Sequence, residues 1–149
     1  MNLELQIETD ASGLPPREDF VAWTETALEG ETRRGLVIRI VDEAESRQLN
    51  REYRGRDKPT NVLSFPFEVP SGVPNEHLGD LVICAHVVAK EAQQQHKPLA
   101  HHWAHMVVHG VLHLRGYDHM QEHEAEIMES RERQLLAALS VPDPYRETA

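Results

Sequence analysis

Cysteine and long apolar runs are scarce in this sequence. Cys84 is the only cysteine in 149 residues, so an intrachain disulfide is excluded and a reducing compartment is favoured. No apolar run approaches the roughly 20 residues that a membrane-spanning helix needs, and the N-terminal residues lack the basic and apolar segments of a signal peptide. We therefore expect a cytoplasmic protein that does not interact with a membrane.

Positive charge is also scarce. The chain has 15 Lys and Arg residues against 25 Asp and Glu residues, a formal net charge of −10, which excludes a surface that is basic throughout. Acidic residues are concentrated within residues 118–149, whereas Arg51, Arg54, Arg56 and Lys58 follow one another closely. An anionic substrate would therefore be bound locally, by this basic segment.

Aromatic residues make up only 5% of the chain, which leaves few side chains for stacking on nucleic-acid bases. Tyr53 and Phe65 are the candidates for such stacking. Because aromatic side chains are so few, we expect both of them in the core instead.

The length predicts one domain over residues 1–149. A chain of this length buries about two-thirds of its unfolded surface without disulfides or a structural metal. Residues 99–114 are apolar on almost every side, which predicts a helix buried in the core. The patterns place strands within residues 3–8, 36–41, 60–67 and 78–84, and helices within residues 15–28, 42–54, 85–95, 99–114 and 121–139.

Individual residues predict further details of these elements. Asp42, followed by Glu45, resembles a capping arrangement at the start of a helix. Pro66 has no backbone N–H to donate, so its strand is expected at a sheet edge. Residues 69–77 are expected to connect two neighbouring antiparallel strands. The last helix is expected to expose an acidic face and to bury Ala125, Met128, Leu135 and Leu139.

Histidines near the end of this buried helix have the spacing of a metal site. His109 and His113 are four residues apart, so on a helix their imidazoles lie one turn apart and can point at one ion. Gly116 suits the left-handed conformation that often follows a helix, and the reversed chain can bring His119 back toward the other two. Three neutral imidazoles leave the fourth position of a zinc ion open for water, as in catalytic sites.

The three histidines and Gly116 also match the metal-binding frame of the metzincin peptidases, with one departure. Gly110 stands where those enzymes have the glutamate that acts as general base. The pattern therefore predicts one Zn²⁺ per chain at the three histidines, without the peptidase base. His101 and His105 extend the histidine stripe, and we interpret them as neighbours of the site or as solvated residues.

Three linked motifs resemble those of the YbeY family of bacterial rRNA maturation factors. They are His109-Gly110-x-Leu112-His113-Leu114-x-Gly116-Tyr117-Asp118-His119, Leu49-Asn50-x-x-Tyr53-Arg54 and Pro59-Thr60-Asn61-Val62-Leu63-Ser64-Phe65-Pro66, and the similarity extends through Gly79-Asp80. The resemblance implies a zinc-dependent endoribonuclease, specific for single strands, that acts in 16S rRNA 3′-end maturation and ribosome quality control. It also implies an α+β fold, in which a small mixed β-sheet and helices pack around a central buried helix that carries the metal-binding histidines. The partners it implies are single-stranded RNA of the 16S rRNA precursor, the small ribosomal subunit, a small-subunit ribosomal protein and a ribosome-associated GTPase.

The resemblance also assigns roles to individual residues. It implies that His109, His113 and His119 bind zinc and that Arg54 and His113 are catalytic. Such a role suits arginine, because a guanidinium can donate to two phosphoryl oxygens as negative charge develops on them. Asn61 stands where relatives are expected to have aspartate, so no carboxylate role is assigned to this position.

The sequence leaves the mechanism and two other functions open. Zinc would either generate hydroxide from bound water or act as a Lewis acid on a phosphoryl oxygen, and a ribose 2′-hydroxyl is an alternative nucleophile. One other function is that of a metallopeptidase whose base comes from outside the helix. The second is that of a non-catalytic ribosome-assembly module with a structural zinc, for which His105 or His123 would be the fourth ligand. Asp118 is interpreted as a turn-stabilising residue.

Overall fold

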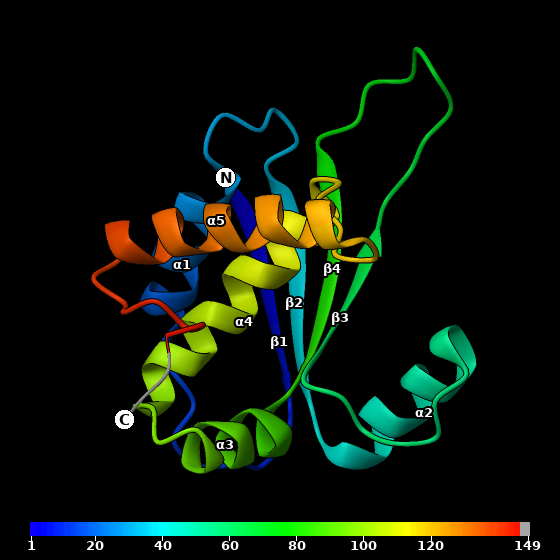
Figure 1. Cartoon of the computed structure of the whole chain (residues 1–149). Helices are drawn as coiled ribbons and strands as arrows, with labels where there is room; N and C mark the ends of the chain where they lie inside the picture. The colour runs from blue at the N-terminus through cyan, green and yellow to red at the C-terminus, as the bar shows by residue number, and fades with distance from the viewer. Residues whose placement is uncertain (147–149) are drawn as a thin grey trace.

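Five helices and four strands make up the described part of the chain (Figure 1). The structure is a computed structural model that describes residues 1–146, so the end of the predicted domain, with Glu147 of the acidic stretch, lies outside the described residues. Within that range, no helix combines the length and the apolar character needed to cross a membrane. In chain order the elements are β1 (Asn2–Glu8), α1 (Arg17–Leu28), β2 (Gly35–Val41), α2 (Glu43–Arg54), β3 (Val62–Pro66), β4 (His77–Cys84), α3 (Ala85–Gln94), α4 (Leu99–Leu114) and α5 (Glu122–Ala138).

The strands form one mixed sheet in the order β1-β2-β4-β3. β1, β2 and β4 run parallel, whereas β3 pairs antiparallel with β4, so that Pro66 lies opposite Gly79. β3 is therefore an edge strand, as predicted from Pro66. The segment between β3 and β4 connects antiparallel neighbours, also as predicted. A mixed sheet packed with helices confirms the expected α+β fold.

Helix α4 is the centre of the fold and has the predicted bounds. Most of its side chains are buried, among them Trp103 and Leu112. It contacts β3, β4, α1, α3 and α5, and these other helices lie around it on one side of the sheet (Figure 1). Paired residues Ile38 of β2 and Leu81 of β4 are fully buried in the same core. Burying one such side chain stabilises the fold by about 1.5–3 kcal/mol.

Helix α2 lies apart from the other helices (Figure 1) and covers a second, smaller apolar cluster. In this cluster Leu49 of α2 packs with Val41, Leu63 and Val82 of the sheet. The helix ends at Gly55, whose left-handed backbone (φ +69°) stops it. This end, predicted from the sequence, places the last residues of α2 beside the edge strand β3.

Two glycines allow close approach, Gly110 between α4 and the sheet and Gly79 between β4 and β3. A Cβ atom at Gly110 of α4 would lie 2.8 Å from Leu81 Cδ2 and 3.3 Å from Val62 Cγ2, so this position faces the sheet. A Cβ atom at Gly79 of β4 would lie 2.6 Å from the carbonyl oxygen of Phe65. Because Phe65 O is a backbone atom, Gly79 depends on glycine, whereas a side chain at Gly110 would require Leu81 to shift.

Asp42 occupies the predicted N-cap position of α2, but it does not cap the helix with its side chain. Asp42 Oδ1 instead accepts a hydrogen bond from the Thr9 hydroxyl and lies 3.3 Å from His86 Nε2. These tertiary partners compete with the backbone N–H groups of the first helical turn for the same carboxylate.

The buried face of α5 differs in part from its prediction. Met128 and Leu135 are buried as expected, whereas Ala125 and Leu139 are only half-buried. Glu132, which belongs to the acidic stretch, is completely buried. An acidic residue in this position needs hydrogen-bond donors around it.

Candidate metal centre

Helix α4 and the turn that follows it bring three histidines together. His109 and His113 lie one turn apart, with ring centroids separated by 4.7 Å. The helix ends in a Schellman motif, in which Gly116 (φ +101°) donates its N–H to His113 O at 3.0 Å. The chain then reverses, so that the ring of His119 lies 4.8 Å from that of His113. Asp118 Oδ1 accepts the backbone N–H of His119 at 2.7 Å and so stabilises this turn.

The three histidines fit a divalent metal ion. Each offers one ligand atom, and these atoms all lie within 4.8 Å of one another. Burial, followed by the charges of His109 and His119, lowers the pKa of His113 to about 4, so its imidazole is neutral at neutral pH and a lone pair is available. Imidazole nitrogen suits zinc and related transition metals. The cluster can therefore hold one metal ion and leave a position open for another ligand.

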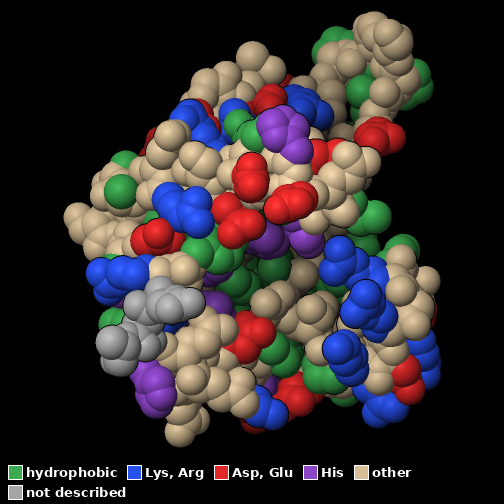
Figure 2. Space-filling model, in the orientation of Figure 1, with side chains coloured by type: hydrophobic (Ala, Val, Ile, Leu, Met, Phe, Trp, Pro, Cys, Tyr) green, Lys and Arg blue, Asp and Glu red, His purple; other side chains and the backbone are tan. Residues whose placement is uncertain are grey.

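The histidines line a cavity of about 570 Å³ between the end of α2, β3 and the end of α4. Figure 2 shows histidine side chains in a hollow of the surface, with Lys and Arg side chains on one side of it and Asp and Glu side chains on the other. The basic side corresponds to α2 and the acidic side to α5. The lining residues are Tyr53, Arg54, Asn61, Val62, Leu63, Ser64, Phe65, Pro66, His109, His113 and His119.

Arg54 lines this cavity with a free guanidinium. Within residues 1–146 its side chain makes no hydrogen bond or ion pair, whereas two arginines on the same helix are engaged. Arg47 Nε lies 2.8 Å and Arg51 Nη1 4.0 Å from Asp57 Oδ1. The positive charge of Arg54 is therefore available to an anionic group that enters the cavity.

A buried carboxylate lies behind the histidine cluster. Glu132 Oε1 accepts a hydrogen bond from His109 Nδ1 at 2.7 Å. Its Oε2 accepts one from His105 Nε2 at 2.8 Å and one from the Tyr145 hydroxyl at 2.5 Å. Burial raises the pKa of Glu132, but the hydrogen bonds from the two histidines outweigh this effect and bring the pKa to about 2. Glu132 is therefore ionised, and its only hydrogen-bonding role is that of an acceptor.

The role of Glu132 was not predicted. Of the two interpretations of His105, the structure supports a neighbour of the site, since its ring lies 6.0 Å from that of His109, and not a solvated residue. His105 is 8% exposed because α5 and the segment after it cover this part of α4. The sequence did contain a signal, since Glu132 has the helical spacing of the buried residues Met128 and Leu135. An acidic residue at a buried position of a helix indicates a carboxylate that is bound by hydrogen-bond donors within the protein.

Comparison with known proteins identifies the family. Residues 8–140 match the sequence model described as Endoribonuclease YbeY. The chain belongs to the YbeY family. Two relatives carry the name Endoribonuclease YbeY: one from Halorhodospira halophila is 60% identical, and the aligned part covers 97% of each chain. The other, from Methylococcus capsulatus, is 58% identical, with coverage of 99% of this chain and 97% of the relative. The resemblance inferred from the three sequence motifs is thus confirmed.

A solved structure shares the fold of this YbeY family member. The solution structure of TM1509 from Thermotoga maritima is 23% identical to this chain, with a TM-score of 0.55. The match covers 96% of this chain and 99% of the other. At this level of identity the comparison supports the arrangement of helices and strands alone.

Tyr53 and Asn61 also line the cavity of this family member. Tyr53 is 65% exposed, so its predicted place in the core is wrong. Among the described residues, the aromatic neighbour of the Tyr53 ring is Phe65, edge to face at 5.0 Å between centroids. Asn61 Nδ2 donates to Glu91 Oε1 at 3.1 Å, and its Oδ1 accepts the N–H of Val62 at 2.6 Å. An ionised aspartate could not donate to Glu91, so an amide suits this position.

No fourth protein ligand joins the three histidines within the described part of the chain. The group that could hold a metal in the cavity consists of these histidines, and a second group, His105, His109 and Glu132, shares only His109 with it. His105, one of the two residues considered for a closed shell, uses its Nε2 for Glu132. His123, the other, is exposed and is not part of the group. This open arrangement is typical of catalytic metal sites.

Proposed function

We propose that this chain is a zinc-dependent endoribonuclease that cuts single-stranded RNA, with His109, His113 and His119 as its zinc ligands. The proposal rests chiefly on one observation, the presence of three imidazoles and Arg54 in the same cavity. Membership of the YbeY family supports an endoribonuclease role, since the relatives at 60% and 58% identity carry that name.

The side chains of the cavity suit phosphodiester cleavage. When bound, zinc supplies either a water with a pKa lowered to about 7 or a Lewis acid for a phosphoryl oxygen. Arg54 donates its planar set of N–H groups to the oxygens of the scissile phosphate, where negative charge increases toward the transition state. His113 presents a neutral nitrogen at the metal position. In this proposal Arg54 and His113 are the catalytic residues.

The position of Gly110 argues against a metallopeptidase with its base at the usual place on the helix, so such an enzyme would need a base from elsewhere. In the enzymes with the corresponding histidine frame, the residue after the first histidine is the glutamate that acts as base. Here that position faces Leu81 and Val62 of the sheet, and a Cβ atom would lie 2.8 Å from Leu81 Cδ2. A structural zinc in an assembly module is also disfavoured, because the described residues supply no fourth ligand.

The charges and the exposed aromatic ring around the cavity favour a single strand of RNA. Arg54 lines the cavity at the end of α2, and Lys and Arg side chains gather on this side of the hollow, whereas Asp and Glu side chains gather on the side of α5, whose first turn contains Glu122 and Glu124 (Figure 2). A phosphate backbone is therefore attracted toward α2. The exposed ring of Tyr53 on this side can stack on the face of an unpaired base. In a duplex the faces of the bases are covered by neighbouring bases and are not open to such stacking.

The cellular role that we propose follows from the family alone. The substrate is the 3′ end of the 16S rRNA precursor in the small ribosomal subunit, and the role includes ribosome quality control in the cytoplasm. A small-subunit ribosomal protein and a ribosome-associated GTPase are the proposed partners. Co-purification with the small subunit from cell extract tests this association, and its failure under conditions where the enzyme is active would contradict it.

Cleavage assays with purified protein test the proposed activity. A single-stranded 16S rRNA 3′-end fragment should be cut by the wild-type protein, while the same fragment annealed to its complement and an unstructured peptide should remain intact. His113→Ala and chelator-treated protein should be inactive, and zinc should restore only the latter. Equal cleavage by wild type and His113→Ala would identify a contaminating nuclease, and cleavage of the peptide would favour the metallopeptidase.

A further inference from the structure

Glu132 is a charged residue placed where burial is unfavourable. It lies between α5 and α4 with no exposed surface, and an ionised carboxylate is retained in such a place only when donors surround it. Three donors do so here, His105, His109 and Tyr145. One of them is a residue of the histidine cluster, so this buried carboxylate is connected directly to the metal centre.

The contact with His109 determines which ring nitrogen of that histidine carries the proton. Glu132 is an acceptor only, so the 2.7 Å contact between its Oε1 and His109 Nδ1 requires a proton on Nδ1. In the neutral imidazole, Nε2 is then left with a free lone pair. The ring of His109 also lies close to His113 and His119, with centroids 4.7 and 5.6 Å away.

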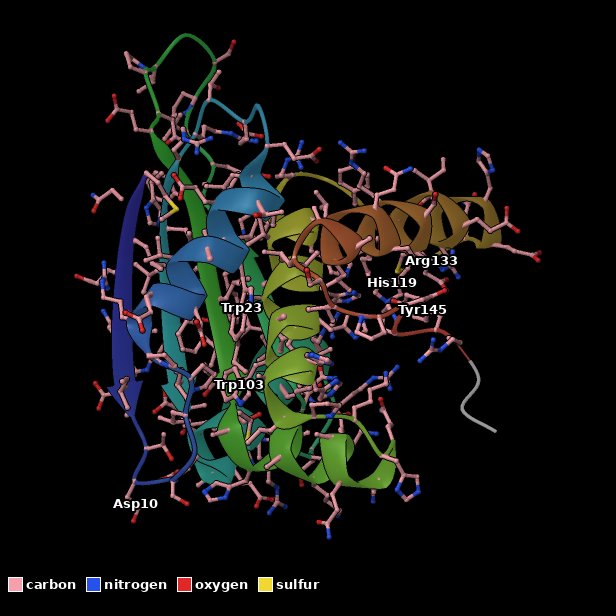
Figure 3. The ribbon with its side chains drawn as sticks, turned by 90° about the vertical axis from the view of Figure 1, so that its left-hand side faces the viewer. Asp10, Trp23, Trp103, His119, Arg133 and Tyr145 are labelled. Atoms are coloured by element: carbon pink, nitrogen blue, oxygen red, sulfur yellow. The ribbon has the colours of Figure 1, made fainter. Side chains whose placement is uncertain are left out.

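The other oxygen of Glu132 is held independently of His109. Oε2 accepts hydrogen bonds from His105, one turn earlier on α4, and from the hydroxyl of Tyr145. Figure 3 shows Tyr145 below α5, on the segment that follows this helix. Lys97 Nζ donates to Pro144 O at 2.9 Å and fixes this segment to the base of α4. The contacts of Oε2 thus fix the orientation of the carboxylate without any contribution from His109.

We propose that Glu132 is a positioning residue of the metal centre, which holds His109 with its Nδ1 protonated and its Nε2 directed at the metal position. This inference rests on the proposed metal site. A ligand histidine whose second nitrogen donates to a carboxylate is fixed in orientation and is a more basic ligand. His105 and Tyr145 act on the metal centre indirectly, because they hold the carboxylate of Glu132, which in turn holds His109.

The first test needs no metal. In the metal-free protein at about pH 8.5, two units above the ordinary pKa of imidazole, long-range ¹H–¹⁵N correlation spectra distinguish the two neutral forms of each histidine. Wild-type protein should show His109 protonated at Nδ1, and Glu132→Leu should lose this preference. A His109 protonated at Nε2 in the wild type would overturn the inference.

The second test measures zinc affinity by competition with a chromogenic chelator. Relative to wild type, Glu132→Gln, which keeps a weaker acceptor, should bind zinc about tenfold less tightly, and Glu132→Leu about 100-fold less tightly. Glu126→Gln, an exposed residue on the same helix, is the matched control and should bind zinc as the wild type does. Circular dichroism of the metal-free variants checks that they are folded, and Glu132→Gln decides the matter if Glu132→Leu is not.

The outcomes separate this inference from the proposed function. If wild type and both Glu132 variants bind zinc within about twofold of one another, a range below the tenfold minimum expected for such a residue, Glu132 has no positioning role and the metal site stands. If the wild type binds no zinc, both the metal site and this inference are wrong. If affinity falls in the order wild type, Glu132→Gln, Glu132→Leu, the role of Glu132 is established.

Discussion

Replacement of Arg54 gives the most specific prediction about the cavity. The guanidinium is exposed and, within the described residues, has no partner in the protein. Arg54→Ala should therefore leave the free energy of unfolding within about 0.5 kcal/mol of wild type, as for other surface substitutions. Any loss of activity then reports on the contact with RNA and not on folding.

The expected loss follows from the hydrogen bonds that Arg54 would make to the scissile phosphate. Removal of one donor positioned for transition-state charge costs about 2.7–4 kcal/mol, or about 100- to 1000-fold in rate. Arg54→Ala should slow single-turnover cleavage of single-stranded RNA by this factor. Arg54→Lys keeps the charge but loses the two-pronged geometry, so a loss of about tenfold is expected.

Arg51→Ala is the matched control for this prediction. Arg51 lies on the same helix, one turn earlier, but its nearest partner is Asp57 at 4.0 Å and it does not line the cavity. Its loss should change the cleavage rate less than about threefold, since it removes only surface charge near the site. If Arg51→Ala and Arg54→Ala are equally slow, general attraction of RNA and not a specific phosphate contact explains the effect, and the role assigned to Arg54 is wrong.

Three further predictions concern stability and RNA binding. Gly79→Ala should lower stability by about 1–3 kcal/mol, because the new Cβ would lie 2.6 Å from Phe65 O, whereas Gly30→Ala, with open space around it, should not; thermal unfolding measures both. In the metal-free protein, the free energy of unfolding should decrease as the pH falls from about 6.5 toward about 4, because His113 takes up its proton in the unfolded state first. Urea titrations across this range check the sign, and a stability that rises toward pH 4 would contradict it. Tyr53→Ala should weaken binding of single-stranded RNA by about tenfold, within the 1–3 kcal/mol of one stacked base, and Tyr53→Phe should not; fluorescence anisotropy in a His113→Ala background measures the affinities, and equal losses would exclude stacking.

The central helix and the histidine turn were predictable because their signals are local. The apolar character of residues 99–114 and the four-residue spacing of His109 and His113 depend only on helix geometry. Gly116 marks the helix end by its own conformational freedom. Pro66 likewise identifies the edge strand, since the missing N–H is a property of the residue itself.

The surroundings of the site were not predictable because they depend on which elements pack together. Glu132 and His109 are 23 residues apart and meet only when α5 docks on α4. The same docking buries His105, and the spacing of the histidines alone does not distinguish a buried His105 from a solvated one. Asp42 has the residue type of a helix cap, but Thr9 and His86 reach it through the tertiary fold. In each case a local propensity is outweighed by contacts that periodicity does not specify.

The claim that three histidines hold one catalytic metal ion is tested most directly by titrating zinc into the metal-free protein while RNA cleavage is measured. Activity on a single-stranded 16S rRNA 3′-end fragment should rise in proportion to added zinc and reach its maximum at one equivalent per chain, and His119→Ala should show no such rise. Full cleavage by the metal-free protein, or none at one equivalent of bound zinc, would contradict the account.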